Sequence, residues 1–69
     1  MIFKLDNPYI TLGQLLKRCD IISSGGQAKF FLADNKVLVN EVHEERRGRK
    51  IYPEDVVLVS GFGEIRVIH

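Results

Sequence analysis

The chain has 69 residues, of which 45% are hydrophobic and 28% are charged, so we expect one small globular domain spanning residues 1–69. A domain of this size has room for only a modest core, which makes a deep catalytic cleft hard to build and a binding surface easier. Ten basic and nine acidic residues leave a net charge of +1, so overall charge indicates no class of partner. Any electrostatic argument has to come from where the charges are placed.

The single cysteine, Cys19, excludes an internal disulfide, and no Cys/His cluster has the spacing of zinc ligands. The first six residues lack the apolar segment of a signal peptide, and the longest apolar runs, such as Val56 to Val59, have four residues. We therefore expect a cytoplasmic protein with no membrane partner, no metal and no cofactor.

The first predicted element is a short strand at Ile2 to Leu5. Asn7-Pro8 ends it, because the residue before a proline avoids helical backbone. A helix is predicted from Leu12 to about Ile21, with Thr11 as its N-cap and Gln14 completing a capping box. Apolar residues at helical spacing give this helix one buried face. Gly13 costs the first helix roughly 1 kcal/mol relative to alanine, a cost that close packing against another segment would explain.

A second helix follows after a short turn. The turn Ser23 to Gly26 leads into a short helix predicted near Gly26 to Ala33, where Ser24 and Gln27 have the spacing of another capping box. Two amphipathic helices joined by four residues are expected to pack as a helix–turn–helix pair.

The second half of the chain has the pattern of strands. β-Branched runs predict strands at Val37 to Val39 and Val56 to Val59, and a third at Glu64 to Ile68. Gly61-Phe62-Gly63 is expected to join the last two as a hairpin, and Tyr52 to Asp55 to form a proline-initiated turn. The fold class is therefore α+β, with two helices on one face of a small, mostly antiparallel sheet. The predicted core consists of Leu12, Leu15, Leu16, Ala28, Phe31, Leu32, Val39 and Val56.

The most informative segment is Arg46-Arg47-Gly48-Arg49-Lys50, which holds four of the ten basic residues. The planar fork of arginine matches phosphate oxygens, and Gly48 lets the backbone come close, so nucleic-acid binding is one interpretation. The run is alternatively a solvated loop whose arginines pair with the preceding glutamates, or a basic edge for an acidic protein partner. The glutamates concerned are Glu41, Glu44 and Glu45.

The turn before the second helix is another candidate site. The backbone N–H groups of Gly25, Gly26 and Gln27 can bind an anion at a helix start, with Lys29 one turn further along. The alternative is a plain capped turn without a ligand. The spacing is not that of a Walker phosphate-binding loop.

No arrangement for catalysis stands out. Cys19 falls on the apolar face of the first helix, which indicates a small buried hydrophobe rather than a nucleophile paired with His43. Phe62 and Tyr52 lie at turns, where an aromatic ring stacks on a base or folds over the edge of the core, and for Phe62 we favour the core. We expect a binding module that is not an enzyme and has no small-molecule substrate.

The order and spacing of these features have a known counterpart. The features are the Leu15-Leu16 helix, the Ser24-x-x-x-Ala28 turn, Leu32 and the Val37-x-Val39-Asn40 strand and turn. Together they resemble the alpha-L RNA-binding motif, the RNA-binding domain of the ribosomal protein S-four type, over most of the chain. Ser-Gly-Gly-x-Ala-Lys and Arg-Arg-Gly-Arg-Lys are similar to its small stand-alone bacterial members. Two departures are Gly25, where many members have arginine, and Glu41, where many have glycine.

This resemblance implies a non-enzymatic module that binds structured RNA such as ribosomal RNA, in a setting of ribosome assembly. Specificity is expected to come from RNA shape. We also expect the basic side chains to share one face, with Glu54, Asp55 and Glu64 elsewhere. The residues expected to contact RNA are Arg46, Arg47, Arg49, Lys50 and Lys29, the N–H groups of Gly25, Gly26 and Gln27, and, at the rim, Lys17 and Arg18.

Overall fold

The computed structural model describes all residues, 1–69, and has an α+β fold, as predicted. Five strands form a sheet in the order β1-β7-β6-β3-β4, in which only β1 and β7 run parallel. In that order the strands are Ile2–Lys4, Gly63–Ile68, Val56–Val59, Val37–Val39 and Val42–His43. The predicted hairpin between β6 and β7 and the predicted first strand are both confirmed.

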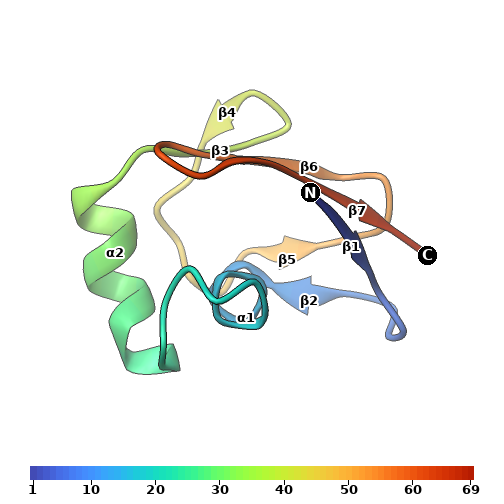
Figure 1. Cartoon of the computed structure of the whole chain (residues 1–69), viewed down its shortest axis with the longest axis horizontal. Coiled ribbons are helices and arrows are strands. Elements are labelled where there is room, and N and C mark those ends of the chain that lie inside the picture. The colour runs from blue at the N-terminus through green and yellow to red at the C-terminus, as the bar shows by residue number, and fades with distance from the viewer.

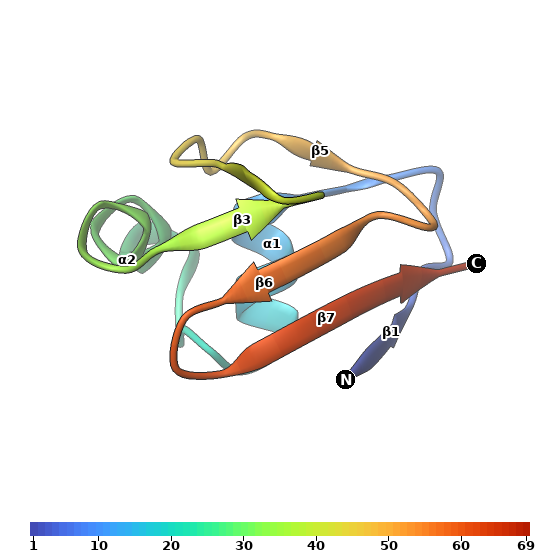
Figure 2. The same cartoon turned by 90° about the horizontal axis from the view of Figure 1, so that it is seen from above.

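A second layer lies beneath this sheet (Figure 1). It contains helix α1 (Leu12–Arg18) and a two-stranded ribbon that pairs β2 (Ile10–Thr11) with β5 (Lys50–Ile51). Helix α2 (Ala28–Asp34) stands at one end of the molecule, and α1 lies behind the sheet in the view from above (Figure 2). The predicted packing of two helices against a mostly antiparallel sheet is therefore confirmed.

The core lies between the two layers, and alternation along the strands decides which residues enter it. Val37 and Val39 face the helices, as do Val57 and Val59, and all four are at most 1% exposed. Val56, which the sequence placed in the core, is only half-buried because its side chain is on the face of the strand opposite to that of Val57 and Val59. Phe31 packs against the core from its margin, and the remaining predicted core residues are fully buried.

The first helix is shorter than predicted. It starts at Leu12, where the capping box of Thr11 and Gln14 is present, but it ends at Arg18 instead of continuing to Ile21. Asp20 has a φ of 59°, so the backbone turns there, and the Ile21 N–H donates to the carbonyl of Leu16 at 3.0 Å. Apolar residues continue at helical spacing beyond the end of α1 because the chain turns back toward the core there. The spacing alone therefore placed the end of the helix too late.

The second helix has two parts. A 3₁₀ turn, Gly25–Gln27, precedes α2, so the regular helix begins at Ala28, two residues later than predicted. The side chain of Gln27 folds back, and its Oε1 accepts hydrogen bonds from the Ser23 and Ser24 N–H groups. Neither helix is long and apolar enough to cross a membrane.

Candidate nucleic-acid interface

The basic run lies in the segment Glu44–Lys50, which reaches the first residue of β5 and is hydrogen-bonded to the start of α1. We call this segment the basic loop. The Leu12 N–H donates to the carbonyl of Arg49 at 2.8 Å, and the Gly13 N–H donates to the carbonyl of Arg47 at 2.9 Å. These bonds satisfy N–H groups that the first turn of a helix leaves free. The basic loop is therefore part of the folded framework and has a defined backbone position.

Gly13 makes this close approach possible. A Cβ atom at Gly13 would lie 3.3 Å from the Cβ of Ala28 and 3.4 Å from both the Cβ and the carbonyl oxygen of Arg47. The space beside the helix is therefore filled from two sides, by α2 and by the basic loop. The cost of a glycine inside α1 is explained by this packing, as the sequence indicated.

Glu44 anchors the basic loop from within. It is only 6% exposed, and its carboxylate accepts five hydrogen bonds. Two come from the side chain of Arg46, one from the side chain of Arg49, and two from the backbone N–H groups of Glu45 and Arg46. The side-chain bonds from Arg46 are the largest cause that lowers the pKa of Glu44 to about 2, against an opposing effect of burial. Glu44 therefore stays charged and holds the loop closed.

This anchor divides the arginines into two kinds. Arg46 forms an ion pair with Glu44 at 3.0 Å while its side chain remains 75% exposed, and Arg49 pairs at 2.9 Å with a side chain only 32% exposed. Arg47 is exposed and has no ion pair with a carboxylate. The alternative of a solvated loop, in which the arginines pair with glutamates, therefore holds in part for Arg46 and Arg49, although the glutamate they share is buried. Arg47 stays free to bind.

The turn before α2 meets the basic loop on one surface. A shallow depression brings Gly25 of the turn next to Arg47 and Gly48 of the basic loop. The Gln27 N–H is already used, since it donates to the Ser24 carbonyl at 3.2 Å, whereas Gly25 and Gly26 are exposed. The depression is lined by Thr11, Gly13, Gln14, Gly25, Ala28, Arg47 and Gly48. Two segments that the sequence singled out separately are therefore neighbours.

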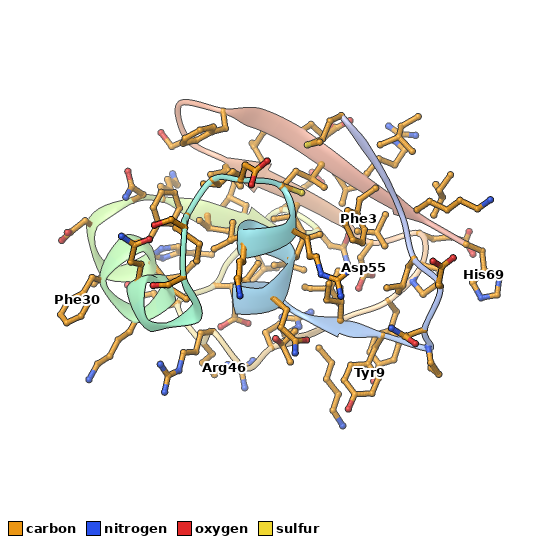
Figure 3. All side chains as sticks on the ribbon, turned by 60° about the horizontal axis from the view of Figure 1, so that its bottom comes forward. Phe3, Tyr9, Phe30, Arg46, Asp55 and His69 are labelled. Atoms are coloured by element: carbon orange, nitrogen blue, oxygen red, sulfur yellow. The ribbon has the colours of Figure 1, made fainter.

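A second depression adjoins the first at Gln14, which lines both. It brings Tyr9 together with Lys17 and Arg18 at the exposed side of α1. Lys29 is exposed on the first turn of α2. It directly follows Ala28, which lines the first depression. Figure 3 shows Tyr9 and Arg46 along the same edge of the molecule, with Phe30 at its far end.

Several residues have surroundings that the sequence did not reveal. Phe62 is 62% exposed, so it does not fold into the core as favoured, although its ring lies 6.3 Å from that of Phe31. Cys19 is half-buried against the core, and burial raises the pKa of its thiol. Tyr9, two residues before the predicted cap Thr11, had no sequence signal for its place beside the β2–β5 ribbon. No sequence signal distinguished Glu44 as the anchor, because three glutamates precede the arginines and any of them could pair with an arginine.

Comparison with known proteins identifies the family of the chain. The family model of the S4 domain matches residues 3–68. The chain is also 52% identical over 65 residues to the probable ribosome maturation protein RlbA of Bacillus subtilis (strain 168), an alignment that covers 94% of this chain and 92% of that protein. Since the family match extends over almost every helix and strand described above, the chain belongs to the S4 domain family.

Proposed function

We propose that this protein is a non-enzymatic RNA-binding module that contacts the phosphate backbone of structured RNA, such as ribosomal RNA, during ribosome assembly. The observation that carries the proposal is the junction of the basic loop with the turn before α2. Arg47 lacks a carboxylate partner, and it lies beside exposed glycine backbone on a surface held in place by α1. Membership of the S4 domain family and the name of the RlbA relative support the same reading.

The proposed contacts have unequal roles. Arg47, Lys29 and Lys50 supply cations, and the N–H groups of Gly25 and Gly26 add donors for phosphate oxygens. Arg46 offers its exposed outer edge while it remains bound to Glu44. Arg49 contributes from deeper in the basic loop, and Lys17 and Arg18 contribute at the rim. Gln27 is left out of the proposed contacts because its N–H donates to the Ser24 carbonyl.

A matched pair of double variants tests this proposal. Lys29→Ala with Arg47→Ala removes two cations from the proposed surface, and Lys36→Ala with Arg66→Ala removes two from other parts of the chain. Both variants change the net charge from +1 to −1 (+1 minus 2), so a difference between them reports position and not total charge. The affinity for a ribosomal RNA hairpin is measured for each at several salt concentrations.

The first double variant is expected to bind more weakly, with the slope of log affinity against log salt reduced by roughly 1.5, because each phosphate contact releases about 0.7–0.9 of a counterion. The second is expected to match the unaltered protein. Equal loss in both variants would contradict the proposed surface. If the unaltered protein has no affinity for RNA even at low salt, the basic loop instead serves an acidic protein partner.

A further inference from the structure

Two tyrosines lie side by side at the end of the β2–β5 ribbon. Ile10 pairs with Ile51 in its antiparallel register, and Thr11 pairs with Lys50. One step further along, the same register sets Tyr9 opposite Tyr52, and their ring centroids are 6.0 Å apart with the planes tilted by 48°. Ile10 and Ile51 are buried, so alternation directs both tyrosines to the outer face of the ribbon.

Both rings are accessible and both are held in position. Tyr9 is 41% exposed and Tyr52 is 48% exposed. The Tyr52 N–H donates to Oδ2 of Asp55 at 2.8 Å, which fixes the turn that carries this ring, and a proline flanks each tyrosine. Because the two rings already contact each other, their side chains would lose little conformational entropy when a flat ligand binds.

A cation accompanies the pair. The Nζ atom of Lys50 lies 5.0 Å from the centroid of the Tyr9 ring. Lys50 belongs to the basic loop, and Tyr9 lines the second depression, which shares Gln14 with the depression beside Arg47 and Gly48. The aromatic pair therefore continues the surface on which RNA phosphates are proposed to lie.

We propose that Tyr9 and Tyr52 form a stacking site for an unpaired RNA base, while Lys50 binds the phosphate of the same nucleotide. This inference rests on the proposed RNA-binding function and deepens it. Aromatic side chains stack on bases without regard to sequence, and a lysine beside the ring neutralises the backbone. The preferred RNA then has a single-stranded flank next to the paired region that the basic loop contacts.

The chain offers a direct optical probe of this site. It contains two tyrosines and no tryptophan, so its tyrosine fluorescence arises only from Tyr9 and Tyr52. Titration with an RNA hairpin carrying an oligoadenylate tail is expected to quench this emission. The same hairpin with an abasic tail has equal backbone charge and is expected to leave the emission nearly unchanged. A free tyrosine derivative in the same titration corrects for light absorbed by the RNA.

Variants separate stacking from electrostatics. Tyr52→Leu is expected to weaken binding of the tailed hairpin by about 5- to 150-fold, without altering the salt slope, because it removes an aromatic face but no phosphate contact. Tyr52→Phe is expected to bind within about twofold of the unaltered protein, since the ring is kept. A blunt hairpin is expected to bind all three proteins alike.

The outcomes distinguish this proposal from the one on which it rests. Salt-dependent RNA binding with no quenching, and with Tyr52→Leu unchanged, would overturn the stacking site and leave the RNA-binding function standing. No RNA binding by the unaltered protein would overturn both. Quenching by the abasic tail equal to that by the adenylate tail would also contradict base stacking.

Discussion

Two regions of this domain, the apolar core and the basic loop, are stabilised in different ways. The interior between α1 and the five-stranded sheet is apolar, and Leu12, Leu15 and Leu16 are fully buried there. The basic loop depends instead on backbone hydrogen bonds to the start of α1 and on one buried carboxylate, Glu44. The first region stabilises the fold by removing apolar surface from water, and the second positions charge by polar contacts.

This difference bears on how the arginines are interpreted. A basic run read from the sequence suggests four equivalent cations, yet Arg46 and Arg49 are needed to keep Glu44 paired. Replacing both would leave a buried carboxylate with fewer partners and would destabilise the loop as well as remove charge. Arg47 is the side chain whose removal tests binding alone. The remaining variants separate the two kinds of stabilisation.

The largest effect is expected in the apolar core. Leu15→Ala removes a fully buried side chain, and we expect the free energy of unfolding to fall by about 2–5 kcal/mol, measured by urea denaturation. A core of this size contributes only about 3–5 kcal/mol, so much of the protein should be unfolded. Arg47→Ala serves as the comparison in the basic loop and should change stability by less than about 0.5 kcal/mol. Similar losses in the two variants would erase the distinction.

The next effect is expected where α1 meets α2 and the basic loop. Gly13→Val places a branched side chain where a single Cβ already approaches Ala28 and Arg47 at 3.3–3.4 Å. We expect a loss of about 1–3 kcal/mol in stability, together with displacement of the basic loop and weaker RNA binding. Gly48→Ala is the control, because a Cβ there meets nothing within 4 Å. If Gly13→Val is as stable as Gly48→Ala, the contact of α1 with α2 and the basic loop is not tightly packed.

The anchor at Glu44 should have a pH signature that the apolar core lacks. The pKa of Glu44 is about 2 in the folded protein, below the ordinary 4.5, so protons bind more readily to the unfolded state. The stabilisation by Glu44 is therefore complete above about pH 5 and is lost as the pH falls toward 2. Glu44→Gln should lower stability by about 1–2 kcal/mol at pH 7 and flatten the pH dependence in this range.

Urea denaturation at a series of pH values measures this effect. Glu64→Gln is the control, because Glu64 is exposed and its contact with Arg66 is long, at 3.4 Å. The control should keep the pH dependence of the unaltered protein. An equally steep acid transition in Glu44→Gln would assign that transition to other carboxyl groups.

The smallest expected effect is a gain in stability at the turn between β3 and β4. Asn40 and Glu41 have φ values of 50° and 70°, the left-handed conformation that glycine adopts without strain. Glu41→Gly should stabilise the protein by up to about 1 kcal/mol, observed as a higher urea midpoint. Glu41→Ala removes the same charge but keeps a Cβ, so it should give no such gain. A gain in both variants would point to charge rather than backbone strain.

Local sequence signals predicted much of the fold. Thr11 and Gln14 marked the start of α1 because a capping box involves residues only three positions apart. The glycines around Phe62 marked the β6–β7 hairpin for a similar reason. Strands β2, β4 and β5 were missed because each has two residues, too few for alternation to be recognised.

The candidate site could be predicted only in part. Clustering of arginines and glycines identified the basic loop and the turn before α2, since both signals are continuous in the chain. Their meeting across Gly13 was not predictable, because it depends on how α1, α2 and the loop pack. The burial of Glu44 rather than Glu41 or Glu45 was likewise decided by the path of the loop.

The sequence alone determined the α+β class, the capped start of the first helix, the main strands and the location of the basic run, because these depend on contacts between near neighbours. Only the tertiary structure decided that Val57 and not Val56 enters the core, that Arg47 stays unpaired, and that Tyr9 faces Tyr52. Each of these depends on register between segments far apart in the chain. A shift of one residue in register exchanges the two faces of a strand, and no local pattern specifies that choice.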